Sequence, residues 1–384
     1  MKRDTILTLK LPRGSALEEY PVREPKQFNR PAGPFTRIAY AAAHVVADPL
    51  GAQEPWLDAA IDWNATIAYR RHLSSWGFGI AEAMDTAQRG MGLDWANSLE
   101  LIRRTLESVP EAVVASGAGT DHLQGSASIA QVISAYEMQC TAIEKLGGRI
   151  ILMASRALAA TAKSPDDYAR VYERILGQVK QPVIIHWLGE MFDPALSGYW
   201  GKQDHDEAMN VCLDVLKRNS SKVDGIKISL LDKEKEIAMR RKLPGGVRMY
   251  TGDDFNFAEL IEGDAQGYSD ALLGIFDSIA PAASQALSLL AENKKAEYHE
   301  VLGPTVPLSR HIFKSPTRFY KTGVVFMAWL NGHQDHFVMV SGQQSARNVL
   351  HFAELFRLAD AAGLLRDPAL ACKRMQQLLA VHGF

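Results

Sequence analysis

The sequence predicts an α/β protein built on a (β/α)8 TIM barrel with a C-terminal helical domain. Short apolar, β-prone runs alternate eight times with longer amphipathic segments, which is the pattern of an eight-stranded parallel barrel. No Gly-rich nucleotide loop follows the first run, as a doubly wound sheet would more often show. After about residue 285 the β-prone runs stop, and only helical patterns remain.

The first 35 residues are rich in Pro, Arg and Glu and show no sustained period. They predict an N-terminal extension, residues 1–35, that lies on the surface or on a neighbouring subunit. The barrel is expected over residues 36–285. Its strands are predicted at Arg37–Ala47, Gly77–Ala83, Ala112–Ser116, Arg149–Ala154, Pro182–Trp187, Val223–Ser229, Val247–Thr251 and Gly267–Leu273.

Most segments between these runs are amphipathic at helical period. Asp94 and Ser164-Pro165 are helix start signals, and Gly147-Gly148 is a stop signal. The barrel helices are predicted to include Asp94–Ser108, Ser128–Leu146, Pro165–Val179, His205–Arg218 and Phe255–Gly263. Residues 286–384 predict a C-terminal helical region, and the helices in and around it are expected at Ala282–Glu300, Phe319–Leu330, Ser345–Ala361 and Asp367–Val381.

Composition narrows the class of protein. Forty-two basic and 44 acidic residues give a net charge of −2, so no nucleic-acid partner is expected. No apolar run approaches the roughly 18 residues of a membrane span, and the N-terminus lacks the apolar core of a signal peptide. The three cysteines are far apart in sequence, which is typical of reduced thiols. We therefore expect a cytoplasmic protein without membrane contact.

Lys227 is the first candidate catalytic residue. Side chains alternate along a strand, so Val223, Gly225 and Lys227 share one face of the predicted strand Val223–Ser229. If that face points into the barrel, burial lowers the pKa of the lysine and leaves a neutral amine that can attack a ketone carbonyl. The alternative is an exposed lysine at a strand end whose stem lies on apolar surface.

Gly225-Ile226-Lys227, followed about 25 residues later by Gly252-Asp253-Asp254, resembles the dihydrodipicolinate synthase/N-acetylneuraminate lyase family. Gly117-Ala118-Gly119-Thr120 is similar to a G-T-G turn of that family, and Pro182–Ile185 is similar to the approach to its fifth strand. The resemblance covers roughly residues 36–285. It implies a TIM barrel with a helical tail, a Schiff-base lysine at Lys227, a homo-oligomer (dimer or tetramer) and no dissociable cofactor.

The sequence departs from the family pattern at three places. His186 stands where the family carries a proton-relaying tyrosine; it could act as general acid/base, or it could be a core histidine bonded to backbone. Asp85–Gly90 replaces the carboxylate-binding loop, and its Thr86 and Arg89 could hold a carboxylate or hydroxyls. Ser155-Arg156-Ala157 replaces a Tyr-Tyr element. The complete set of predicted substrate-binding residues is Thr86, Arg89, Gly119, Thr120, Gly252 and Asp253.

The favoured function is a Schiff-base-forming class I aldolase or lyase. Lys227 would form an iminium with a 2-keto acid or keto-sugar, and His186 would move the proton. Two alternatives stay open. One is a metal-dependent TIM-barrel sugar isomerase or aldolase, and the other is a non-catalytic carbohydrate-binding barrel. The candidate ligands of the metal alternative are His44, Asp48, Asp121, His122, His186 and Asp253.

Overall fold

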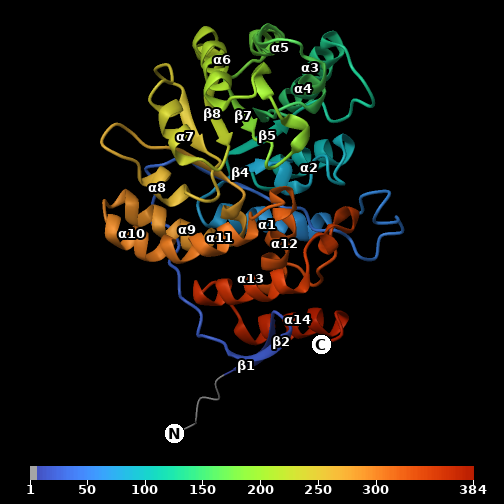
Figure 1. Ribbon diagram of the computed structural model, residues 1–384, viewed down its shortest axis with the longest axis vertical. Coiled ribbons are helices and arrows are strands. Elements are labelled where there is room, and N and C mark those ends of the chain that lie inside the picture. The colour runs from blue at the N-terminus through green and yellow to red at the C-terminus, as the bar shows by residue number, and fades with distance from the viewer. Residues whose placement is uncertain (1–6) are drawn as a thin grey trace.

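A computed structural model describes residues 7–384, and it confirms the predicted TIM barrel with a C-terminal helical region (Figure 1). Eight parallel strands close in the order β10-β3-β4-β5-β6-β7-β8-β9. Each lies within or overlaps one of the eight predicted runs. Their bounds are β3 Ala39–Ala42, β4 Gly79–Glu82, β5 Val114–Ala118, β6 Arg149–Leu152, β7 Val183–Leu188, β8 Val223–Ser229, β9 Arg248–Thr251 and β10 Asp270–Leu273.

Helices surround this barrel, and short polar side chains start several of them. Asp94 accepts a hydrogen bond from Asn97 N at 2.8 Å, and Ser128 forms a capping box with Gln131. The barrel helices are α1 Trp63–Ser75, α2 Trp95–Ser108, α3 Ile129–Lys145, α4 Arg156–Thr161, α5 Pro165–Gln178, α6 His205–Arg218, α7 Lys233–Arg240, α8 Phe257–Glu262 and α9 Ile275–Ala291. Single 3-10 turns lie at η1 Asp85–Ala87, η2 Pro194–Leu196, η3 Tyr199–Gly201 and η4 Ser220–Lys222.

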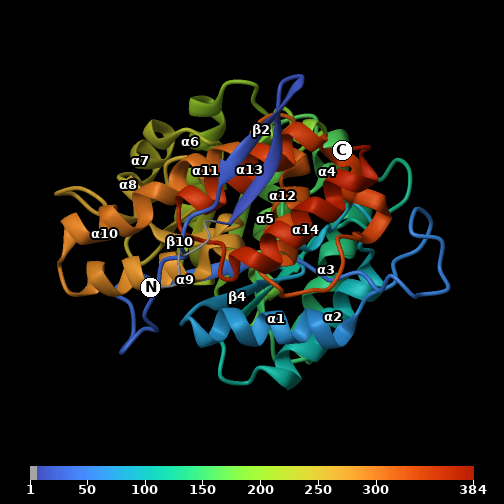
Figure 2. The same cartoon turned by 90° about the horizontal axis from the view of Figure 1, so that it is seen from below.

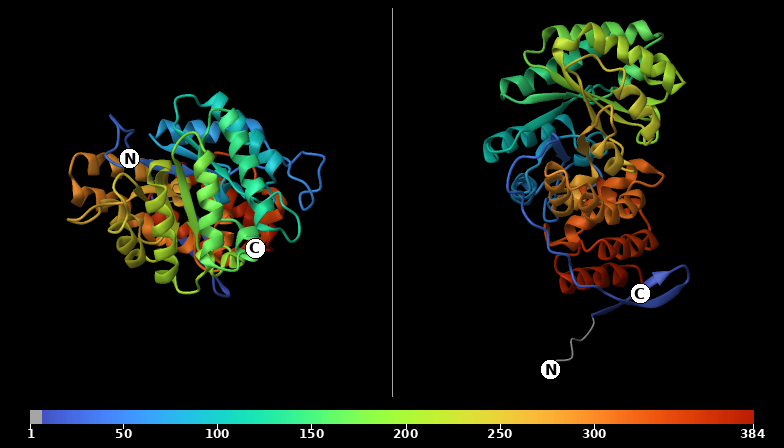
Figure 3. Two further views of the ribbon diagram at one scale, coloured as in Figure 1. Left: turned by 90° about the horizontal axis from the view of Figure 1, so that it is seen from above. Right: turned by 90° about the vertical axis from the view of Figure 1, so that its left-hand side faces the viewer.

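The C-terminal region stacks on one end of the barrel (Figure 3, right). Its helices are α10 Lys295–Leu302, α11 Val306–Ile312, α12 Tyr320–Leu330, α13 Val349–Ala361 and α14 Pro368–Val381, with 3-10 segments η5 Gly303–Thr305, η6 Thr317–Phe319 and η7 Val340–Ala346. Every residue of α12 is buried, because this helix packs against α9, α11, α13 and α14. It is the central helix of the region.

The single helix predicted at Ala282–Glu300 is wrong. Helix α9 starts at Ile275, directly after β10, and ends at Ala291. Asn293 then takes the left-handed conformation, with φ at +59°. The helical conformation is therefore interrupted before α10 begins at Lys295. The predicted boundary between residues 285 and 286 therefore falls inside α9, and the barrel and the helical region share this helix.

The N-terminal residues contain a hairpin that the sequence pattern did not reveal. Strands β1 Thr8–Arg13 and β2 Ala16–Pro21 pair antiparallel and lie beside α13, at the end of the molecule away from the barrel (Figures 1 and 2). Buried Asp360 on α13 accepts hydrogen bonds from Tyr20 Oη at 2.6 Å and Arg23 N at 3.0 Å. The segment thus packs on the chain's own C-terminal helices. All but one residue of β2 are exposed, so no alternating pattern marked it.

The barrel interior has its own small apolar core, separate from the layer between strands and helices. Its members come from seven strands and from residues just after two of them, and they are Tyr40, Ala42, Ala81, Met84, Ala115, Ile151, Met153, Ile184, Tyr250 and Leu272. This core fills the barrel and leaves the carboxyl ends of the strands to polar side chains. Across residues 7–384, no helix combines the length and apolar character that crossing a bilayer requires.

Candidate active site

Lys227 is buried inside the barrel on β8, between His186 on β7 and Tyr250 on β9 in the strand register. Two glycines make room for side chains at this place. A Cβ at Gly225, two residues earlier on the same face, would lie 2.6 Å from a ring carbon of Tyr250. A Cβ at Gly252 would lie 2.7 Å from the Cε of Lys227. Both contacts are shorter than real Cβ atoms tolerate, so Gly225 leaves room for the ring of Tyr250, and Gly252 leaves room for the side chain of Lys227.

Burial changes the protonation of Lys227 and of the nearby Asp254. Burial lowers the pKa of the lysine amine, while the charges of Asp254 and Asp85 oppose that change. Burial raises the pKa of Asp254 to about 7. The carboxylate also accepts a hydrogen bond at 2.9 Å from the backbone N of Ile275, the first residue of α9. Removal from water thus pushes both groups toward their neutral forms, and a neutral amine is the nucleophilic form of lysine.

His186 lies beside the lysine with one ring nitrogen free. Its Nε2 is 3.1 Å from the hydroxyl of Ser229, whereas its buried Nδ1 has no hydrogen-bond partner among the described residues. Burial, and then the charge of Lys227, holds the pKa of His186 well below its usual range. The ring is therefore a neutral imidazole, which can accept a proton from a bound molecule.

Tyr320, the first residue of α12, reaches this site from the C-terminal region. Its hydroxyl is 2.8 Å from the Oγ1 of Thr86, and both side chains are buried. Burial raises the pKa of Tyr320 well above its usual value, so the phenol keeps its proton. This residue could not be recognised from the sequence, because no local motif marks it and it follows the barrel's last strand. Its position at the start of an apolar helix was the only available signal.

These side chains surround a small pocket that opens beside a larger cavity. The residues around the lysine are Ala42, Met84, Asp85, Thr86, His186, Leu188, Phe192, Lys227, Ser229, Asp254, Gly274 and Tyr320. The larger cavity has a volume of about 470 Å³. Asp85, His186 and Leu188 line both spaces, so the larger cavity adjoins the lysine. A small molecule in that cavity would lie next to the lysine pocket, whose own volume is about 10 Å³.

Gly119 and Thr120 line the larger cavity, as does Arg89. The backbone N of Gly119 donates to Gln139 at 2.7 Å, and the hydroxyl of Thr120 is 2.6 Å from that of Ser155. Thr120 thus lies at the cavity wall, and its hydroxyl is already hydrogen-bonded to that of Ser155. Either of the two hydroxyls can be the donor.

Arg89 directs all of its N–H donors to the protein. Its Nε donates to Asp121 at 2.9 Å, its Nη1 to the carbonyls of Ala83 and Gly117 at 3.2 and 2.9 Å, and its Nη2 to Asp121 and Gln139. A guanidinium has five donors, so none is left over for a substrate carboxylate in this arrangement. Arg156 lines the same cavity, is partly exposed, and forms an ion pair with Asp193. It is the better placed cation of the two.

Asp253 and Asp254, which are neighbours in the Gly252-Asp253-Asp254 motif, have different surroundings. Asp253 accepts from Phe255 N at 2.8 Å and Asn256 N at 3.0 Å, and its second oxygen accepts from the Asn256 side chain at 2.8 Å. It therefore shapes the turn after β9 and lines neither space. Asp254 is the member that faces the lysine.

The candidate metal ligands do not come together. His44 Nδ1 is 2.8 Å from Asp277, Asp121 pairs with Arg89, and His122 Nδ1 is 2.9 Å from Gln139. Among residues 7–384, no three His, Cys, Asp or Glu side chains form a group that could hold a metal ion.

Comparison with solved structures supports the resemblance at the level of the fold. A putative dihydrodipicolinate synthetase from Pseudomonas aeruginosa superposes with a TM-score of 0.65 at 14% identity, over 85% of this chain and 99% of that one. The 4-hydroxy-tetrahydrodipicolinate synthase of Methylacidiphilum fumariolicum SolV gives 0.65 at 16% identity, over 89% and 99%. The chloride-inhibited dihydrodipicolinate synthase of Acinetobacter baumannii, complexed with pyruvate, gives 0.63 at 16% identity, over 85% and 99%.

Comparison with curated protein sequences finds no match. A family model does match, over residues 9–384, which is nearly the whole chain. Its description is "Protein of unknown function (DUF993)". The chain is thus similar in fold to dihydrodipicolinate synthases at low identity, and it belongs to the DUF993 family.

Proposed function

We propose that this protein is an aldolase-type lyase that forms a Schiff base between Lys227 and a small 2-keto acid or keto-sugar. One observation carries the proposal: a buried lysine with a lowered pKa stands at the end of a barrel strand, beside a cavity large enough for a small substrate. The fold shared with dihydrodipicolinate synthases supports the same choice. The substrate is a small molecule, and no dissociable cofactor is required.

The chemistry begins with the neutral amine of Lys227 attacking the substrate carbonyl carbon, which gives a carbinolamine. Loss of water then leaves an iminium, and the departing oxygen must receive a proton. Asp254, whose pKa is about 7, lies close enough to Lys227 to influence its charge and can supply that proton. The iminium withdraws electrons from the adjacent carbon, so a C–C or C–O bond next to it can break or form.

His186 and Tyr320 take complementary parts in the proton transfers. The neutral ring of His186 accepts a proton from the substrate through its free Nδ1 or through Nε2. Tyr320 and Thr86 form a hydrogen-bonded hydroxyl pair that can pass a proton toward the lysine pocket. In this scheme Tyr320 fills the role that the resemblance assigned to a barrel tyrosine, but it comes from α12.

Substrate recognition falls to the larger cavity. Thr120 and Gly119 lie at its wall, and Arg156 offers a cation for a carboxylate. Arg89 keeps the cavity wall in shape through its bonds to Asp121 and Gln139. Gly252, which has no Cβ, leaves room for the Cε of Lys227.

The test is reductive trapping with borohydride across a panel of 2-keto acids and keto-sugars, read by intact mass and peptide mapping. We expect a covalent mass gain on Lys227 with one or a few members of the panel, and none in Lys227→Ala. Lys321→Ala is the matched control, because Lys321 is a second buried lysine whose pKa burial lowers to about 8. Absence of any adduct, or an adduct that persists in Lys227→Ala and disappears in Lys321→Ala, contradicts the proposal.

A further inference from the structure

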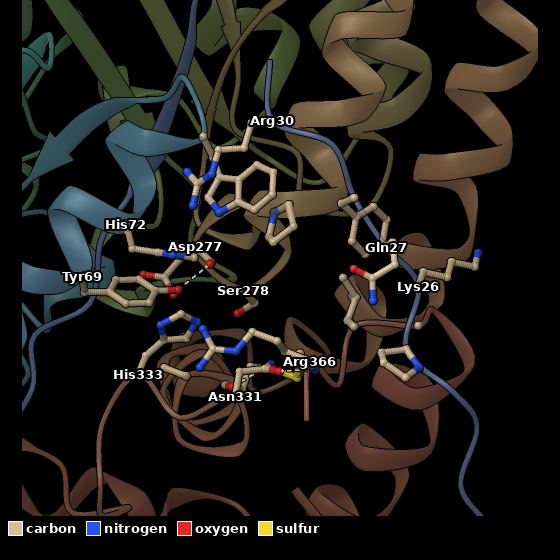
Figure 4. A pocket seen from close by; sticks show the side chains of 18 residues that line it. Lys26, Gln27, Arg30, Tyr69, His72, Asp277, Ser278, Asn331, His333 and Arg366 are labelled. Carbon is tan, nitrogen blue, oxygen red and sulfur yellow. Dashed lines mark hydrogen bonds between the residues drawn. The ribbon is translucent and has the colours of Figure 1, made fainter. Parts of the chain in front are cut away.

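A second cavity, of about 250 Å³, lies outside the barrel and shares no lining residue with the lysine pocket or the cavity beside it (Figure 4). Its walls come from α1, α9, the end of α12 and the chain segment before the barrel. That segment is fixed in place, because Lys26 N donates to Gly363 O at 3.1 Å and Asn29 N donates to Gln285 at 2.9 Å. The cavity is thus built from parts of the chain that are far apart in sequence.

The charge around this cavity favours an anion. Lys26, Arg30 and Arg366 line it, and none of them forms an ion pair with a described residue, although Nη1 of Arg30 donates to the backbone O and the hydroxyl of Ser75. Asp277 is the only carboxylate among the described residues of the lining, and it is already engaged by His44 Nδ1 at 2.8 Å and by the Tyr69 hydroxyl at 3.1 Å. Figure 4 shows Lys26 extending away from the centre of the cavity and Arg366 extending toward His333. Arg30 and Arg366 are therefore the two cations available to an anion in the cavity.

The walls between these cations are aromatic. The rings of His72 and His333 lie with centroids 4.3 Å apart, and the guanidinium of Arg30 lies 4.4 Å from the centroid of Trp76. Tyr69 packs edge-on against His333, with centroids 5.0 Å apart. Flat walls of this kind fit a planar ring, which gains contact area at small conformational cost.

Two buried polar atoms in the lining have no partner among the described residues. They are the indole Nε1 of Trp76, a residue only 8% exposed, and the hydroxyl of Ser278. Figure 4 shows Ser278 between the groups around His72 and those around Arg366. A buried donor without a partner is costly, so a ligand that accepts hydrogen bonds would be stabilised at this place.

We infer that this cavity is a second ligand site, which binds a small carboxylate carrying a planar ring. The carboxylate lies between Arg30 and Arg366 and accepts from Ser278 or Trp76, and the ring packs among Tyr69, His72 and His333. The inference is independent of the imine chemistry, because no residue of the lysine pocket takes part.

The experiment is calorimetric titration of the full-length protein with three probes: benzoate, benzamide and inorganic phosphate. Benzamide keeps the ring without the charge, and phosphate keeps the charge without the ring. We expect saturable binding of benzoate at one site, and at least about tenfold weaker binding of the other two, because a charge-assisted hydrogen bond and an aromatic contact each contribute on that scale. Absence of saturable benzoate binding, or equal affinity for all three probes, overturns the inference.

Substitutions test whether benzoate binds in this second cavity. Arg30→Gln and Arg366→Gln remove exposed charges, so neither threatens folding, and each should weaken benzoate binding by about tenfold. Arg71→Gln is the matched control, because Arg71 is on the same helix as His72 but donates to Ser108 O outside the cavity. Lys227→Ala should leave benzoate affinity unchanged. Benzoate affinity that falls in Lys227→Ala but not in Arg30→Gln or Arg366→Gln would place the probe in the barrel and refute the second site.

Discussion

Lys227 and Asp254 form a buried pair in which the carboxylate opposes the effect of burial on the amine. Burial lowers the pKa of Lys227 and the charge of Asp254 raises it, with burial the larger influence. The neutral amine predominates above its pKa, so the proposed imine formation should occur at a lower pH than an ordinary lysine near 10.4 would allow. The pH profile of trapping therefore reports on this pair.

We predict that Asp254→Asn moves the rise in Lys227 trapping rate to lower pH, by roughly one unit, because the variant removes the charge that supports the protonated amine. The measurement is the initial rate of borohydride-trapped adduct against pH. Asp253→Asn is the control: its carboxylate is bonded within the turn and does not act on the pKa of Lys227. A profile that stays in place in Asp254→Asn would contradict this account of the pair.

Tyr320→Phe removes one hydroxyl and keeps the ring, which stacks on Phe313 with centroids 4.4 Å apart. We predict a fall in kcat of about 100-fold, because a proton-transfer partner is lost, with a melting temperature close to that of the parent. Thr86→Val should show a similar fall, since the two hydroxyls act as one pair. Tyr298→Phe, which removes a buried hydroxyl bonded to Ala258 O, is the control and should leave kcat unchanged. Parent-level turnover in Tyr320→Phe would exclude the relay.

At the residue scale, the sequence located Lys227 but assigned its neighbours less well. Strand alternation placed Lys227 and Gly225 on one face, and the structure brings that face inward. Alternation says nothing about turns, so the roles of Asp253 and Asp254 could not be separated before their hydrogen bonds were known. Tyr320 was missed because its partner Thr86 is 234 residues away, and only packing brings them together.

At the scale of elements, α7 carries a buried acid that links pH to stability. Glu236 accepts from the Ser269 hydroxyl at 2.6 Å, and burial raises its pKa to about 8, against 4.5 for the free side chain. A raised folded-state pKa contributes stability below about pH 4.5, and that contribution is lost as the pH rises toward 8. The protein should therefore lose stability over this range through Glu236.

We predict that Glu236→Gln gains stability over the parent as the pH rises from 5 to 8, by an amount on the order of a few kcal/mol at pH 8. Glutamine keeps an oxygen for Ser269 and cannot ionise, so the difference should be small at pH 5. Urea unfolding at the two pH values measures it. Glu234→Gln, an exposed position on the same helix, should show no such trend. A difference from the parent that does not change with pH would rule out Glu236 as the source.

The elements themselves were predicted where pattern and burial agree. The eight barrel strands are buried runs bounded by helical segments, and all eight were found. The hairpin β1–β2 was missed because β2 is mostly exposed. Its residues therefore do not show the alternation of apolar and polar side chains that marks a half-buried strand. The break between α9 and α10 was missed because one residue, Asn293, ends the helix by its conformation while the apolar spacing continues.

At the scale of the whole molecule, the N-terminal hairpin is tied to the C-terminal helices through one carboxylate. Asp360 receives hydrogen bonds from Tyr20 and from the backbone and guanidinium of Arg23, and its side chain is only 2% exposed. Arg357, one turn earlier on α13, donates to Pro12 O at 3.1 Å. The first and last parts of the described chain therefore form one packed end.

We predict that Asp360→Ala loosens the hairpin, since it removes the acceptor shared by the Tyr20 hydroxyl, the Arg23 backbone N and the Arg23 guanidinium. The melting temperature should fall by roughly 2–4 °C, and limited proteolysis should cut near residues 22–24 earlier than in the parent. Asp335→Ala is the control, because Asp335 is fully exposed in its ion pair with Arg374. Equal protease resistance in Asp360→Ala and in the parent would show that other contacts hold the hairpin.

The place of Tyr320 in the chain has a consequence for synthesis. All eight strands and Lys227 precede residue 274, but the phenol beside Thr86 belongs to a helix that starts at residue 320. A ribosome-bound chain could close its barrel and bury its lysine while the proton-relay partner is still being translated. Under the proposed function, the nascent protein would carry the nucleophile without the complete relay, and catalysis at full rate would begin only when the last helices have docked.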